Sequence, residues 1–116
     1  MNASALACVP EISAESFLNG DVDAYVLDVR GEHEHRAGAL EGSLNIPHTR
    51  LKPRLDSLPR DKPIVAHCKG GMRSAAATAF LRRQGFDVIN LAGGYMALEK
   101  SGALLVKGDE HKIMTG

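Results

Sequence analysis

Several residue types that often indicate a class of protein are scarce or absent in this sequence of 116 residues. Tryptophan is absent, aromatic residues make up 4%, and there are two cysteines. Two cysteines cannot form the disulfide framework that stabilises many small secreted domains. No apolar run approaches the ~18 residues of a membrane-spanning helix, and the first ten residues lack the basic start and apolar stretch of a secretory signal. We therefore expect a cytoplasmic protein.

Net charge is also lacking, because 14 Lys and Arg balance 14 Asp and Glu. This balance gives no global attraction to nucleic acid or to an anionic membrane, and we expect neither as a partner. The charges are nevertheless unevenly distributed: Glu11 to Glu41 holds eight acids and two bases, whereas Arg50 to Arg83 holds nine bases and two acids. Such a split favours a basic surface suited to a small anion or an acidic partner; two solvated faces are the alternative interpretation.

The rest of the composition, 44% hydrophobic and 24% charged, is that of an ordinary globular protein. We expect residues 1–116 to form a single domain with loose ends at 1–10 and 108–116. Strand-like and helix-like segments alternate, which indicates an α/β fold with a mainly parallel sheet. We expect strands at Ala24–Val29, Ser43–Ile46, Pro63–His67 and Asp87–Leu91, helices at Ala14–Asn19, Glu32–Arg36, Thr49–Leu58, Ser74–Gln84 and Tyr95–Ser101, and packing of Leu104–Val106 on the body.

The most informative segment joins the strand that ends at His67 to the alanine-rich helix. It reads Cys-Lys-Gly-Gly-Met-Arg-Ser from Cys68 to Ser74. In α/β sheets ligands bind at the carboxyl ends of strands, where this turn lies. Loop amides and the helix N-terminus would stabilise a thiolate at Cys68 and lower its pKa below the ordinary ~8.5. Lys69 and Arg73 would add positive charge for an anionic substrate; the alternative is a buried structural cysteine in an ordinary turn.

Four ordered motifs between about Ile12 and Gly108 resemble those of single-domain rhodaneses, which are thiosulfate sulfurtransferase-type domains. The loop from Cys68 to Ser74 is similar to the family's active loop, Cys-x-x-Gly-x-Arg-Ser. The other three are Leu27–Arg30 followed by Glu34, similar to an Asp-x-Arg strand and its Glu; Gly38–Pro47, similar to Gly-His-Ile-x-Gly-Ala-x-Asn-Ile-Pro; and Leu91–Gly94, similar to the Gly-Gly before the last helix. The family's usual histidine and tryptophan are Ala39 and Leu98 here.

The resemblance implies a rhodanese-like α/β fold, with a central, mainly parallel five-stranded sheet flanked by helices on both faces. It also implies a sulfurtransferase in which Cys68 takes a sulfane sulfur from thiosulfate or a persulfide donor. The resulting persulfide would pass the sulfur to cyanide, a small thiol or a protein acceptor, without a metal or organic cofactor. The implied substrate-binding residues are Lys69, Gly70, Gly71, Met72, Arg73 and Ser74, and the implied supporting residues are Asp28, Arg30 and His67.

Two other functions remain open at this point. The first is a persulfide-carrier or regulatory module that docks on a partner enzyme. The second is a cysteine phosphatase or arsenate reductase, because the His67–Cys68 pair is similar to the His-Cys pair of phosphatases. Those enzymes place five residues between their Cys and Arg, whereas four separate Cys68 from Arg73. A smaller ring of amides suits one sulfur atom better than a phosphate.

Other candidate residues carry weaker indications. His33 and His35 flank Glu34 and, with Glu32, could suggest a metal site, but nothing in the sequence completes a tetrahedral set, and we expect no metal. His48 follows Pro47, just after the end of a strand, and is expected to be half-exposed, with a position near the loop as the alternative. Cys8 is expected to be inert.

Overall fold

The five-stranded parallel sheet expected from the sequence is present. The computed structural model describes residues 9–107. Its sheet has the order β1-β6-β5-β2-β4, and every neighbouring pair is parallel. The central strand β5 is buried at all four positions, as a parallel sheet covered on both faces requires. The strands are β1 (Glu11–Ile12), β2 (Tyr25–Asp28), β4 (Leu44–Asn45), β5 (Ile64–His67) and β6 (Val88–Leu91).

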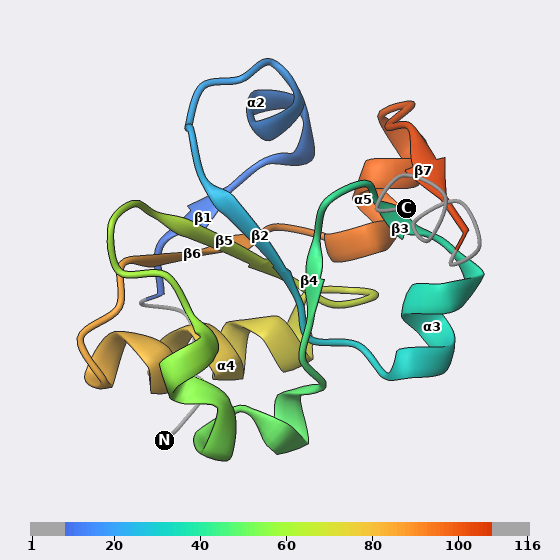
Figure 1. Cartoon of the computed structure of the whole chain (residues 1–116). Helices are drawn as coiled ribbons and strands as arrows, with labels where there is room; N and C mark the ends of the chain where they lie inside the picture. The colour runs from blue at the N-terminus through green and yellow to red at the C-terminus, as the bar shows by residue number, and fades with distance from the viewer. Residues whose placement is uncertain (1–8, 108–116) are drawn as a thin grey trace.

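Helices cover both faces of this sheet (Figure 1). On one face lie α2 (Ala14–Leu18) and α5 (Gly94–Lys100), and on the other lies α4 (Met72–Arg83). Two 3₁₀ helices, η1 (His48–Arg50) and η2 (Lys52–Ser57), accompany α4. The short helix α3 (Glu32–Ala37) follows β2. Within residues 9–107, no helix has the length and apolar character needed to cross a membrane.

Alternate residues of β5 face two separate cores, as the two-residue period of a strand dictates. Ile64 and Ala66 belong to the core on the α4 side, together with Leu81 of α4. Val65 belongs to the core on the α5 side, with Leu98. Cys68 continues the first set and lies in the α4-side core. The strand period therefore directs the residue after β5 toward the start of α4.

One element differs from its expected form. The segment Thr49–Leu58 was expected as one helix, but it forms η1 and η2, separated at Leu51. Pro53 lies at the start of η2, where its missing N–H is tolerated. The same missing donor prevents a continuous i→i−4 ladder through the segment, which explains the two short 3₁₀ pieces.

Both ends of the described chain are attached to the body. The apolar stretch at Leu104–Val106 forms β7 (Leu105–Val106), which pairs antiparallel with β3 (Ala39–Leu40). At the other end lies β1, a strand that was not expected from the sequence. Just before it, the Pro10 carbonyl accepts a hydrogen bond from the Asn90 N–H at 2.9 Å. The last residue of the segment expected to be loose, 1–10, is thus bonded to β6. The rest of that segment through residue 8, and residues 108–116, lie outside the described part of the chain.

Candidate functional site

Cys68 lies between the carboxyl end of β5 and the first turn of α4, and it is 1% exposed. The chain turns sharply there because Gly71 adopts a left-handed conformation with φ of +106°, which a side chain would disfavour. As a result α4 begins at Met72, two residues before the expected start. The cysteine is therefore placed against the N-terminus of a 12-residue helix.

The sulfur of Cys68 is surrounded by hydrogen-bond donors. The Gly71 N–H donates to Sγ at 3.0 Å, and the Ser74 hydroxyl oxygen lies 3.4 Å from it. Burial raises the pKa of the Cys68 thiol, but the Ser74 hydroxyl and the amides of Ser74, Gly71 and Arg73 outweigh it. The pKa is lowered overall, in the direction expected from the sequence, so this environment favours a thiolate.

A buried asparagine that sequence reasoning missed organises these donors. Asn90 Oδ1 lies 2.6 Å from the Ser74 hydroxyl, and its Nδ2 donates to the Gly71 carbonyl at 3.4 Å and to Glu11 at 3.0 Å. The single hydroxyl proton of Ser74 therefore has three acceptors within reach: Asn90 Oδ1, the Gly71 carbonyl oxygen and the sulfur. The available signal was one polar residue near the end of the otherwise apolar strand Val88–Leu91.

The arginine of the loop is not a free cation. Its guanidinium makes two hydrogen bonds to the Glu34 carboxylate of α3, at 2.9 and 3.0 Å. This pairing with Arg73 lowers the pKa of Glu34 to about 2. Arg73 was expected to add positive charge for an anionic substrate, and the ion pair with Glu34 neutralises part of that charge. Lys69, Gly70 and Met72 are exposed, and Met72 is 73% exposed.

The predicted supporting residues Asp28 and Arg30 form a buried ion pair, with Nε–Oδ1 at 2.9 Å and Nη2–Oδ2 at 2.7 Å. Burial raises the pKa of Asp28, but hydrogen bonds from His35 and Arg30 outweigh it and hold that pKa well below its ordinary range. Arg30 also donates to the Gly38 carbonyl at 2.7 Å. These contacts join β2 to the segment after α3 and do not reach the sulfur of Cys68.

His67 faces away from the sulfur, toward α5. Its Nδ1 lies 3.3 Å from the Cys68 carbonyl oxygen. Its buried Nε2 has no partner among the described residues. Burial lowers the pKa of His67. The His67 ring stacks on the ring of Tyr95, with 6.5 Å between the two ring centroids. Tyr95 was not predicted; its N–H donates to the Cys68 carbonyl at 2.7 Å, and Arg30 lies over its ring.

The two histidines of α3, His33 and His35, do not gather around a common point. His35 is turned toward Asp28, and His33 lies 3.1 Å from the Arg36 guanidinium. In the described part of the chain, no group of three or more His, Cys, Asp or Glu side chains could hold a metal ion. Cys8 lies outside the described residues. The site is thus defined as a cysteine-centred loop at the carboxyl edge of a parallel α/β sheet.

Comparisons with known proteins identify the family in which this arrangement occurs. A model of the rhodanese-like domain matches residues 13–101, and the chain belongs to that family. A sulfurtransferase of Allochromatium vinosum is 33% identical over 102 residues, covering 84% of this chain and 95% of that protein. A putative sulfurtransferase of Bacillus subtilis is 32% identical over 94 residues, covering 78% and 91%. A rhodanese-related protein from Thermoplasma volcanium has a TM-score of 0.80 at 33% identity, covering 84% and 97%.

Proposed function

We propose that this protein is a sulfurtransferase that moves a sulfane sulfur from thiosulfate or a persulfide donor, through a persulfide on Cys68, to cyanide or a thiol. The observation that carries the proposal is the buried sulfur with the Gly71 N–H at 3.0 Å, next to the N-terminus of α4. Relatives named as sulfurtransferases at about one-third identity support it. We also propose a cytoplasmic location, where reducing conditions keep Cys68 free.

The first half-reaction forms the persulfide. The Cys68 thiolate attacks the outer sulfur of thiosulfate, a new S–S bond forms, and the S–S bond to sulfite breaks. Sulfite leaves with the electron pair of that bond. The negative charge then lies on the terminal sulfur, where backbone N–H groups of the loop stabilise it. Exposed Lys69 attracts the anionic donor to the mouth of the loop.

The second half-reaction returns the enzyme to its starting state. Cyanide or a thiolate attacks the terminal sulfur, and the bond to Sγ breaks. The electron pair returns to Cys68, and thiocyanate or a new persulfide leaves. Because the sulfur is held covalently between the two steps, we expect ping-pong kinetics.

The length of the loop favours sulfur over phosphate chemistry. Four residues separate Cys68 from Arg73, and α4 already begins at Met72. The amides of Gly71, Arg73 and Ser74 therefore converge on the sulfur itself, as the lowered pKa of Cys68 reflects. A ring of this size suits one additional sulfur atom. A phosphoryl group would need its donors farther out, around three equatorial oxygens.

Mass spectrometry of the intact protein tests the proposal directly. Incubation with thiosulfate should add one sulfur, about 32 Da, and subsequent cyanide should remove it with formation of thiocyanate. Cys68→Ser should acquire no adduct and make no thiocyanate, whereas the matched variant Cys8→Ser should do both. Comparison of glutathione persulfide with thiosulfate as donor separates an enzyme from a carrier. Efficient hydrolysis of an aryl phosphate without a persulfide adduct would instead assign phosphatase chemistry.

A further inference from the structure

A groove of about 240 Å³ lies between the two 3₁₀ helices and α4. Leu51, Ala77 and Phe80 give it an apolar lining, and Lys52 and Arg73 contribute charged side chains to its wall. η1 packs directly against α4. An apolar groove whose wall carries Lys52, beside an Arg73 that Glu34 partly neutralises, is suited to a ligand that combines an apolar side chain with acidic groups.

The groove adjoins the Cys68–Ser74 loop, with which it shares Arg73. Arg73 lines the groove, and its own backbone N–H is one of the groups that lower the pKa of Cys68. Met72 and Ala76 are both exposed and lie one turn apart on α4, so they share one face of the helix. An apolar stripe therefore runs from the edge of the loop along α4 to the groove.

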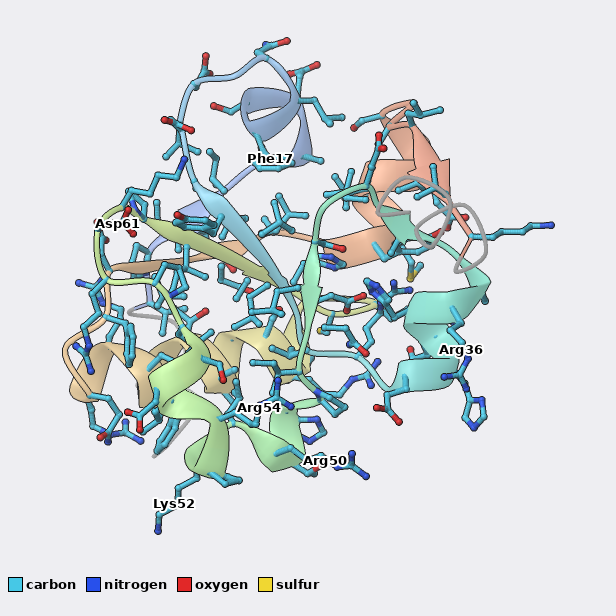
Figure 2. All side chains as sticks on the ribbon, in the orientation of Figure 1. Phe17, Arg36, Arg50, Lys52, Arg54 and Asp61 are labelled. Carbon is cyan, nitrogen blue, oxygen red and sulfur yellow. The ribbon has the colours of Figure 1, made fainter. Side chains whose placement is uncertain are left out.

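The surroundings of the groove are basic. Arg50, Lys52 and Arg54 are exposed on the 3₁₀ helices, as Figure 2 shows, and no acidic residue occurs from residue 42 to 55. The Arg50–Glu32 contact at 3.9 Å joins two side chains that are more than half exposed, so it neutralises little. Asp56 is the acid that follows. The uneven charge distribution in the sequence thus becomes a basic surface next to the site.

We propose that this groove docks an acidic protein segment that carries the sulfur-accepting thiol. The inference rests on the proposed function and names the class of acceptor. An apolar side chain of the segment would pack on Leu51 and Phe80, and its carboxylates would face Lys52 and its neighbours. The thiolate of the segment attacks the terminal sulfur of the persulfide, the bond to Sγ breaks, and the electron pair returns to Cys68. A zero net charge and a mainly apolar lining surface favour a protein over a nucleic acid.

The probes are two synthetic peptides that each contain one cysteine and one leucine. The first is flanked by Glu and Asp, and the second has Lys at those positions. The rate of peptide persulfide formation by the loaded protein is measured, and is divided by the peptide's own rate with free glutathione persulfide to remove differences in thiol reactivity. We expect the acidic peptide to react at least about tenfold faster at low salt, with the ratio approaching one in about 1 M salt.

Two variants test the surface and the groove separately. Lys52→Glu combined with Arg54→Glu should abolish or reverse the preference for the acidic peptide. Its matched control is Arg36→Glu with Lys100→Glu, which changes the charge equally on α3 and α5 and should keep the preference. Each rate is expressed relative to the rate with cyanide for the same variant, so that any general loss of activity cancels.

A second variant, Ala76→Trp, should fill the groove from an exposed position of α4 and slow the acidic peptide about fivefold or more relative to cyanide. Leu104→Trp, at a side chain that is 77% exposed near β7, is its control. Equal rates for the two peptides, or variants without effect, would overturn the inference. So would a single-stranded RNA oligonucleotide that binds more tightly than the acidic peptide. Failure of the wild type to make thiocyanate would contradict the proposed function itself, whereas normal thiocyanate without a peptide preference would contradict the docking alone.

Discussion

At the position of Cys68, burial and hydrogen bonding move the pKa in opposite directions, and hydrogen bonding prevails. Alkylation by iodoacetamide should therefore titrate with an apparent pKa below the ~8.5 of a free cysteine. Ser74→Ala should raise this pKa, because the Ser74 hydroxyl is foremost among the groups that lower it. The pH dependence of the alkylation rate measures both values. A wild-type pKa at or above ~8.5 would show that the amides do not stabilise the thiolate.

The Glu34–Arg73 pair is expected to act on activity more than on stability. Both side chains are about one-third exposed, so loss of the pair should change the free energy of unfolding by less than about 1 kcal/mol. Glu34→Gln and Arg73→Lys each remove the bidentate ion pair, and each should lower kcat/KM for thiosulfate. The double variant should be little worse than either single one, since both act through one contact. Additive losses in steady-state assays would show that the two residues act independently.

At the scale of the elements, the contact between the loop and α5 depends on a glycine. Gly94 has φ of +58°, and a Cβ there would meet the carbonyl groups of Cys68 and Lys69. Gly94→Ala should cost about 1–2 kcal/mol for the left-handed backbone and a further ~1–3 kcal/mol for the overlap. Gly102→Ala is the matched control, because its φ is +79° and nothing lies within 4 Å of its Cβ position. Denaturant unfolding of both variants should show the larger loss for Gly94→Ala.

Some of these helices and strands could be predicted from the sequence, and others could not. The strand Ile64–His67 and the helix Met72–Arg83 were predictable because each has a continuous local pattern, apolar in one and alanine-rich in the other. β1 spans two residues, too few for any periodicity, and it exists because Ile12 pairs with Leu91 of a strand far along the chain. The division of Thr49–Leu58 into two 3₁₀ helices was not predicted, because it depends on the backbone hydrogen bonds that the chain can form around Pro53.

The candidate site likewise has a part that could be predicted from the sequence and a part that could not. The Cys68–Ser74 loop is contiguous, so its donors and its sulfur could be predicted from order and spacing alone. Asn90 and Tyr95 reach this loop from β6 and α5, and the ion pair of Arg73 spans 39 positions in the sequence. Contacts of that kind are set by the stacking of elements, which a single sequence does not specify residue by residue.

At the scale of the whole molecule, acidification should destabilise the fold before any carboxyl group titrates. Burial lowers the pKa of His67 in the folded state, with Asp28 partly opposing it and Arg30 and His35 adding to it. The unfolded chain therefore binds a proton near pH ~6.5 that the folded chain does not, and stability falls as the pH drops below that value. The lowered pKa values of Asp28 and Glu34 act later, below about pH 4.5, where the unfolded carboxyls bind protons.

Denaturant unfolding at a series of pH values between 7.5 and about 5 measures this dependence. His67→Gln should flatten the decline, because it removes the group that titrates in the unfolded chain. His48→Gln, at an exposed histidine, should leave the decline in place. A wild-type stability that is constant across this range would contradict the assignment to His67.

The strand order also bears on biosynthesis. β1 is the earliest strand of the sheet to be translated, yet its neighbour is β6, where Glu11 lies opposite Asn90. A nascent chain that ends before β6 contains Cys68, but it lacks the asparagine that contacts Ser74 and Gly71. Such a chain also leaves one edge of β5 unpaired. The thiol and the loop groups that donate to it are therefore translated before the asparagine that holds two of them in place. We expect the site to mature only when nearly the entire domain has emerged from the ribosome.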